Sequence, residues 1–150
     1  VARLMASTGK IRLVEAFFDA NGTMMELTRF LFIGLGGFLG ANLRYIVQGW
    51  AAGRFGVALP YGTMIANVSG SFLLAFFITL ANQRLPIDLG WRLFFAVGLM
   101  GGYTTFSSFS VETLALFQSG QWLAGGINFF GNTLLGLTAA LLGVWAAQIL

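Results

Sequence analysis

The fold of this chain depends on the stretch GLMGGYTTFSSFS, residues 98–110, which lies inside a long apolar run. The run suits a bilayer-spanning helix, yet the stretch carries three glycines, two threonines and three serines. Glycine costs about 1 kcal/mol in a helix interior, and the paired Gly101 and Gly102 indicate a break. A break exposes backbone carbonyls and amides, which lipid tolerates only where protein buries them or a polar cavity contains them. The stretch therefore predicts a polar site at membrane depth.

Two phenylalanines follow the predicted break. Phe106 and Phe109 are three residues apart and share one helix face, with Thr105 and Ser108 on the neighbouring face. A phenyl ring has a negative face and a positive edge. Two ring edges beside hydroxyl donors can carry a small anion without a fixed positive charge. Simple side-chain packing is the alternative, and the spacing alone favours it.

The composition is that of a membrane protein. The chain has 150 residues, of which 57% are hydrophobic and 9% charged, whereas soluble proteins carry roughly 25% charged residues. It has no His and no Cys, which removes the usual transition-metal ligands and redox pairs. The net charge of +3 is thinly spread, so no basic run indicates nucleic acid. No nucleophile, base and orienting group converge in the sequence, so an enzyme is not expected.

Four segments are expected to cross the bilayer as helices, and they are residues 29–47, 61–80, 93–117 and 122–150. Residues 1–26 differ from them in being rich in charge, and we interpret this stretch as a leader, either disordered or an over-extended start. Residues 27–150 then form a single membrane domain. Gly36 and Gly40 in the first span make a Gly-xxx-Gly pair, which predicts close packing of that helix on another.

Several polar residues interrupt these spans. Arg44 lies near the far end of the first span, where it either snorkels to the interface or attracts anions. Asn67 in the second span needs partners in hydrocarbon, as interhelical glue or as part of a polar path. Glu112 lies one helical turn past the phenylalanine pair, either solvated at the interface or at the exit of an anion path. Asn128 and Asn132 share a face of the fourth span.

Three motifs together resemble one family. They are GGFLGANLRY (36–45), PYGTMIANVSGSF (60–72) and GGYTTFSSFSVE (101–112). In this order and in so short a chain, they are similar to the motifs of the small dual-topology fluoride channels (Fluc, or CrcB), over residues 27–150. The resemblance implies an all-α membrane protein of four helices, the third broken at mid-membrane. It also implies an antiparallel homodimer in the bacterial inner membrane that lowers cytoplasmic fluoride by passive export.

The resemblance further implies functional residues. Those expected on the fluoride path are Asn67, Phe106, Phe109, Asn132, Arg44 and Glu112. Asn132 stands where the family has hydroxyl-bearing residues in its fourth helix. The family also holds a structural sodium ion at the dimer centre through backbone carbonyls of the broken helix, and the matching positions are Gly101 and Thr104. A hard cation takes oxygen ligands, and two carbonyls from each subunit make four.

Two other functions are alternatives to a channel. A proton-coupled small multidrug exporter is also a tiny four-helix protein, but it needs an ionisable residue deep in a span, placed in such transporters on the first helix. The first span here has no Glu, and Glu112 is far from mid-bilayer. A non-transporting membrane subunit leaves the glycine break and the polar face unexplained. The sequence leaves open a homodimer or a paired heterodimer, and a fixed or a dual orientation, because the charge bias between loops is small.

Overall fold

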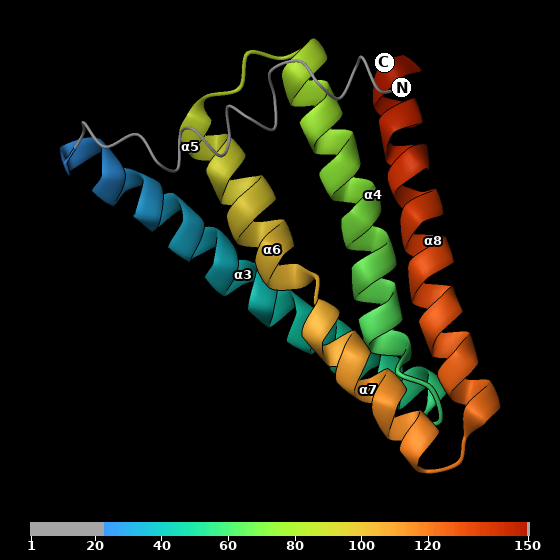
Figure 1. Ribbon diagram of the computed structural model, residues 1–150. Helices are drawn as coiled ribbons and strands as arrows, with labels where there is room; N and C mark the ends of the chain where they lie inside the picture. Colours follow the sequence, from blue (N-terminus) through green and yellow to red (C-terminus); the bar gives the residue numbers. More distant parts are fainter. Residues whose placement is uncertain (1–22, 150) are drawn as a thin grey trace.

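The structure is a computed structural model that describes residues 23–149, and every regular element in that range is helical (Figure 1). The long helices are α3 (Thr23–Phe55), α4 (Tyr61–Gln83) and α8 (Trp122–Ile149). Between α4 and α8 lie four shorter elements, which are α5 (Leu89–Arg92), the π-helix η1 (Leu93–Leu99), α6 (Met100–Tyr103) and α7 (Phe106–Gln118). In Figure 1, α4 and α8 run side by side, and α3 runs diagonally along α6 and crosses behind α7 in this view. The main packing pairs are α4 with α8, and α3 with η1 and α6.

The predicted helix boundaries agree best with the structure at the starts of two helices. Both α4 and α8 begin at the predicted residues, Tyr61 and Trp122. Helix α3 is longer than predicted, because it continues through residues 48–55, which we expected in a loop. It ends where Gly56 adopts a φ of 79°, a left-handed conformation that favours glycine. Of the predicted leader, only residues 23–26 lie within the described range, in the first turn of α3.

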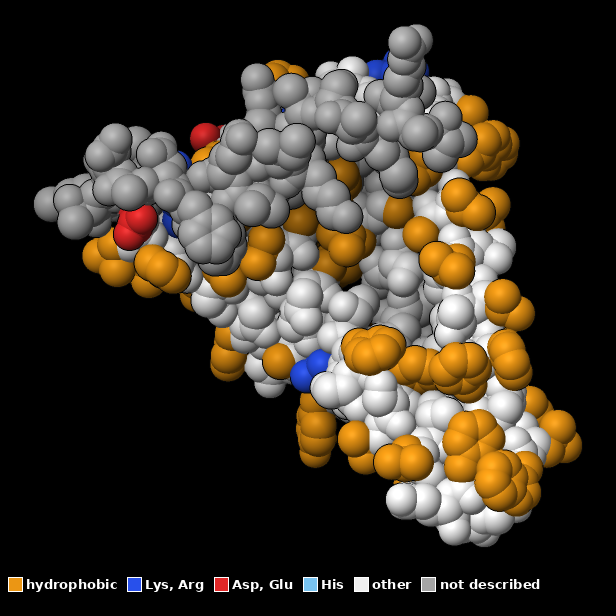
Figure 2. Space-filling view, in the orientation of Figure 1, with side chains coloured by type: hydrophobic (Ala, Val, Ile, Leu, Met, Phe, Trp, Pro, Cys, Tyr) orange, Lys and Arg blue, Asp and Glu red, His pale blue; other side chains and the backbone are white. Residues whose placement is uncertain are grey.

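Three helices are long and apolar enough to cross a membrane within the described range. They cover residues 26–55, 61–83 and 122–149, with mean hydropathy of 1.5, 1.9 and 1.5. The predicted third span, residues 93–117, is divided among η1, α6 and α7, and none of these reaches the roughly 20 residues of a full span. Figure 2 shows hydrophobic side chains distributed over the outer surface, including that of α8, with few charges among them. Such a surface suits a protein surrounded by lipid.

Glycines hold α3 close to η1 and α6. A Cβ on Gly102 would lie 2.7 Å from the Gly37 carbonyl oxygen, and one on Gly98 would lie 2.7 Å from the Ile33 carbonyl oxygen. From the other side, a Cβ on Gly36 or Gly40 would overlap the backbone of η1 or its end. The expected packing role of Gly36 and Gly40 is therefore confirmed. Gly102 belongs to the same contact, which gives it a role other than breaking a helix.

We expect Gly40→Ala to destabilise the fold. The added methyl group meets the Leu99 carbonyl oxygen and lies 2.8 Å from the Tyr103 nitrogen, and backbone cannot move aside as a flexible side chain does. Overpacking of this kind costs about 1–3 kcal/mol, so the midpoint of thermal unfolding in detergent should fall. Gly34→Ala is the matched control, because its Cβ has nothing within 4 Å. Equal midpoints for the two variants would contradict the proposed contact.

The helical interruption lies later than predicted. Gly101 and Gly102 are both helical in α6, and the backbone becomes extended at Thr104 (ψ 158°) and Thr105 (φ −153°, ψ 115°). The expected break at the glycine pair is therefore wrong by three residues. Gly102 is a glycine because α3 approaches it closely, and the chain leaves the helix where side chains from another helix take over its backbone hydrogen bonds.

Candidate functional site

Asn67 holds the interrupted backbone from α4. The Thr105 N–H donates to Asn67 Oδ1 at 2.8 Å, and Asn67 Nδ2 donates to the Thr105 carbonyl oxygen at 3.1 Å. One amide side chain thus satisfies both polar groups of an extended residue, which a helix would otherwise pair. This double contact also determines which end of the amide is oxygen. The expectation that Asn67 faces protein polar groups is met, and its partner is the interruption itself.

A chain of amides continues from Asn67 into the bundle. Asn67 Nδ2 donates to Asn132 Oδ1 at 3.0 Å, and Asn132 Nδ2 donates to Asn128 Oδ1 at 2.9 Å. Asn128 Nδ2 then donates to Thr113 Oγ1 at 2.8 Å, and that hydroxyl donates to the Phe109 carbonyl oxygen at 2.7 Å. Asn128 is fully buried and Asn132 is 7% exposed. Every donor in this amide chain points the same way, from the interruption toward Phe109.

Hydroxyl groups gather where α7 begins. Thr105 caps the helix, because its Oγ1 accepts from the Ser108 N–H at 3.2 Å. The same hydroxyl donates to Ser108 Oγ at 3.0 Å and lies 3.3 Å from Ser107 Oγ. Since Ser108 Oγ accepts this bond, its own proton remains to be donated elsewhere. The predicted hydroxyl face therefore exists, and it lies at the first turn of α7.

The two predicted phenylalanines lie against each other at this turn. The ring centroids of Phe106 and Phe109 are 5.6 Å apart with an interplanar angle of 57°. Phe106 is 79% exposed, while Phe109 is 7% exposed and stacks on Phe129 of α8 with centroids 6.1 Å apart. The packing interpretation accounts for Phe109. It does not account for Phe106, whose ring stands largely outside the fold beside the interruption.

Arg44 reaches the interruption from α3. Its Nη1 donates to the Thr104 carbonyl oxygen at 3.2 Å, and the residue is half-buried. Because α3 continues to Phe55, Arg44 is not near the end of its helix as predicted. It lies in the helix interior and brings a positive charge to the extended backbone.

The carbonyls of Gly101 and Thr104 have the donor chemistry of a sodium site. In a continuous helix the Thr105 N–H would bond the Gly101 carbonyl, but here it donates to Asn67 instead. The Gly101 carbonyl thereby loses its regular helical partner, and Gly101 is exposed. The Thr104 carbonyl accepts from Arg44 and keeps a second lone pair. Hard oxygen donors of this kind suit a hard cation, although the Arg44 charge opposes a cation on the Thr104 side.

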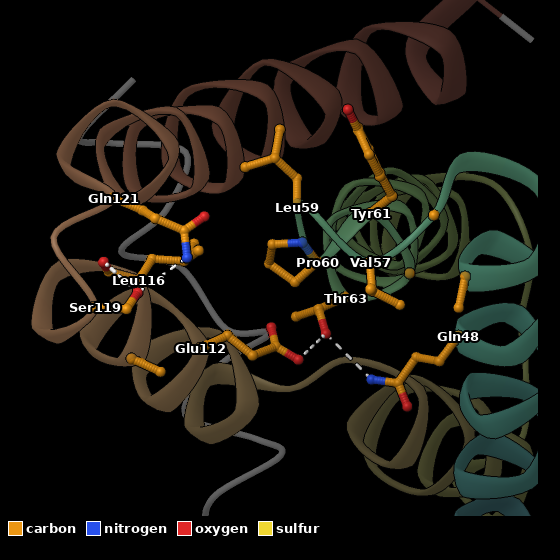
Figure 3. Close-up of a pocket in the computed structure, with 14 residues that line it drawn as sticks. Gln48, Val57, Leu59, Pro60, Tyr61, Thr63, Glu112, Leu116, Ser119 and Gln121 are labelled. Atoms are coloured by element: carbon orange, nitrogen blue, oxygen red, sulfur yellow. Dashed lines mark hydrogen bonds between the residues drawn. The ribbon is translucent and has the colours of Figure 1, made fainter.

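Glu112 occupies a different place from the other predicted residues. Its Oε1 accepts from Thr63 Oγ1 at 2.8 Å, and Gln48 Nε2 donates to the same threonine oxygen at 3.1 Å (Figure 3). The other oxygen, Oε2, is buried without a hydrogen-bond partner. These side chains line an open pocket of about 620 Å³ beside the α3–α4 loop and the α7–α8 turn. Glu112 therefore lies near an end of the helical bundle, and not with the amide chain.

The structure brings together most of the predicted path. Asn67, Asn132, Phe106, Phe109 and Arg44 surround the interruption, whereas Glu112 is apart from it. Thr113, Thr63 and Gln48 were not predicted from the sequence, and Asn128 had no predicted role. Two of these residues could have been found from their spacing to predicted site residues. Asn128 is four residues before Asn132, and Thr113 is four residues after Phe109, so each pair meets along one helix face.

The chain is similar to a family of known proteins. Residues 31–144 match the family model described as CrcB-like protein, Camphor Resistance (CrcB). A fluoride-specific ion channel FluC from Roseiflexus sp. (strain RS-1) is 46% identical over 118 residues, covering 79% of this chain and 95% of that protein. Proteins of the same name from Rhodospirillum rubrum and Anaeromyxobacter dehalogenans are 44% and 48% identical over 80% and 76% of this chain, and over 92% and 90% of their own lengths. The chain belongs to the CrcB family.

Proposed function

We propose that this chain is a passive fluoride channel that lowers cytoplasmic fluoride by letting the ion leave along its gradient. The observation that carries the proposal is the interruption at Thr104 and Thr105, whose backbone is held by the half-buried amide of Asn67 between helices fit to span a membrane. Lipid tolerates irregular backbone only where protein buries it or where it lines a polar cavity. The exposed Gly101 and Phe106 beside this interruption favour the polar cavity. The relatives named fluoride-specific ion channels support fluoride as the solute.

In the proposed third span, η1, α6 and α7 act together as one broken transmembrane helix. Fluoride is small and strongly hydrated, so the path must replace its water with hydrogen-bond donors and positive ring edges. The exposed Phe106 ring and the hydroxyls of Ser107 and Ser108 offer these at the interruption. Arg44 attracts the anion there, and Phe109 supplies the second ring edge.

The asparagines contribute differently. Both N–H groups of Asn67 and of Asn132 already have acceptors, so either amide must release a bond in order to donate to fluoride. Asn67 can exchange its bond to the Thr105 carbonyl for one to the anion. Glu112 lies at the proposed outer end of the path, where its pocket opens beside the loops.

The assembly we propose is an antiparallel homodimer in the bacterial plasma membrane. The exposed positions at the interruption support it, because Gly101 and the 79% exposed Phe106 leave this region open to a second copy. A structural sodium ion between the copies would be held by the carbonyls of Gly101 and Thr104. Its positive charge would attract the carbonyl oxygens of both copies and hold the two interruptions together.

Fluoride efflux from liposomes tests the proposal. Purified protein is reconstituted with potassium fluoride or chloride inside, a potassium ionophore is added, and an ion-selective electrode records the anion released. We expect rapid fluoride efflux, with chloride retained and no requirement for a proton gradient. A proton-coupled exporter would instead move a cationic drug only when a proton gradient is imposed. Absence of fluoride efflux from protein that elutes as a single species contradicts the proposal.

A further inference from the structure

Two members of the amide chain, Asn128 and Thr113, have no part in the proposed path. Asn128 is fully buried, and its side chain bonds only Thr113 and Asn132 among the described residues. Thr113 is 6% exposed. Asn128 is bonded to the Asn132 amide nitrogen and Thr113 follows Asn128, whereas Asn67 is bonded to the Asn132 amide oxygen.

The direction of this chain is set from both ends. At one end the Thr105 backbone dictates the Asn67 amide orientation. At the other end the Thr113 proton goes to the Phe109 carbonyl oxygen, which leaves Thr113 Oγ1 to accept from Asn128. A flipped Asn132 would place its NH2 group against the NH2 group of Asn67 and its oxygen against Asn128 Oδ1. Both contacts would lose a hydrogen bond in a buried place, where an unsatisfied group is costly.

We propose that Asn128 and Thr113 are positioning residues, which orient the Asn132 and Asn67 amides at the helix interruption and thereby set the rate of ion passage. This inference rests on the proposed function for its effect on flux, but the orientation itself does not depend on it. Neither residue needs to touch the ion. Because Asn132 accepts from Asn67, one Asn67 N–H is held at Asn132 while the other stays at the Thr105 carbonyl of the interruption.

Thr113→Val is the decisive variant. Valine has the shape of threonine but cannot accept from Asn128 Nδ2. Thr113→Ser keeps the hydroxyl and should restore the flux. Thr79→Val is the matched control, because Thr79 is also buried and donates to the carbonyl four residues earlier, Ala75 O at 2.8 Å, with no asparagine partner. We expect fluoride efflux to fall about tenfold for Thr113→Val, as loss of a buried acceptor predicts, and to stay at the parental level for Thr79→Val.

A second readout follows the orientation without any flux. In protein labelled with ¹⁵N at the asparagine side chains, Thr113→Val should shift the Asn67 amide resonance, although three hydrogen bonds separate the two residues. Thr79→Val should not. If the parent passes no fluoride, the proposed function fails, yet this shift still tests the positioning. Parental resonances in Thr113→Val overturn the inference, and so does parental flux where the parent conducts.

A variant that does not fold is replaced by another. If Thr113→Val fails to elute as the parent does, Asn128→Leu removes the same link with a side chain of similar size. A folded Asn128→Leu with strongly reduced flux and a shifted Asn67 resonance supports the inference. Parental values for both measurements overturn it.

Discussion

We expect Asn67→Asp to abolish fluoride efflux while the protein still elutes as the parent does. The aspartate has no N–H group, so an oxygen replaces Nδ2 opposite the Thr105 carbonyl and Asn132 Oδ1, two acceptors that now lie 3.1 and 3.0 Å from it. Its negative charge also repels the anion. Two like charges about 4 Å apart repel by about 4 kcal/mol at an effective dielectric constant of about 20, which predicts a loss of about a hundredfold or more.

Asn82→Asp is the control for this chemical change. Asn82 is exposed near the end of α4, and its Oδ1 accepts from Arg92 Nη1 at 2.7 Å, so a carboxylate there keeps a cationic partner. The measurement is the initial efflux rate at equal protein-to-lipid ratio. Parental efflux from an assembled Asn67→Asp protein would remove Asn67 from the path. An equal loss in Asn82→Asp would show that the added charge acts at a distance, not at the interruption.

The long helices could be predicted from local signals. Turn residues and apolar length placed the starts of α4 and α8 at Tyr61 and Trp122. The end of α3 was missed because residues 48–55 carry polar residues and an aromatic that resemble an interface, although no strong helix breaker occurs before Gly56. The π-helix η1 was not predicted at all. It packs closely against the α3 glycines Gly36 and Gly40, and the sequence of 93–99 carries no local signal for a π-helix.

The position of the interruption could not be predicted locally. Glycine pairs indicate breaks, and Gly101 and Gly102 had no visible partner in the sequence. The structure shows that Gly102 meets Gly37 of α3, while the chain opens at Thr105 because Asn67, 38 residues earlier, takes its backbone N–H. A break determined by a distant side chain has no local signature. The predicted polar site was nevertheless only three residues from the observed interruption, because both lie within the motif of residues 101–112.

The separation of Glu112 from the other residues has a similar cause. Spacing placed it on the Phe109 face, one turn further along α7. Its carboxylate instead accepts from Thr63 near the loops. The next residue, Thr113, joins the amide chain, so adjacent residues of α7 enter different networks. Residue spacing therefore predicted which polar residues share a face of one helix. The three-dimensional pairing of α4 with α8 decided which of them became one network.

Phe106→Ile and Phe109→Ile should both lose fluoride efflux while eluting normally, with Phe106→Ile the more severe because Phe106 is the first residue after the interruption. Isoleucine keeps bulk and apolarity but removes the positive ring edge. If the rings only pack, near-isosteric exchange costs less than about 1.5 kcal/mol and leaves flux intact. At the 79% exposed Phe106, packing within one subunit has little to lose, so a loss of flux with an unchanged elution volume is a sign of the ring edge.

Two other phenylalanines serve as matched controls for these variants. Phe30 is 63% exposed on α3, comparable with Phe106, and Phe76 stacks on Phe72 with centroids 6.1 Å apart, as Phe109 does on Phe129. Phe30→Ile and Phe76→Ile should retain parental efflux. Size-exclusion profiles and efflux are measured on the same preparations. If Phe106→Ile and Phe109→Ile conduct like the parent, the ring edges do not contact the anion, and the hydroxyls of α7 with the Asn67 amide must carry it alone.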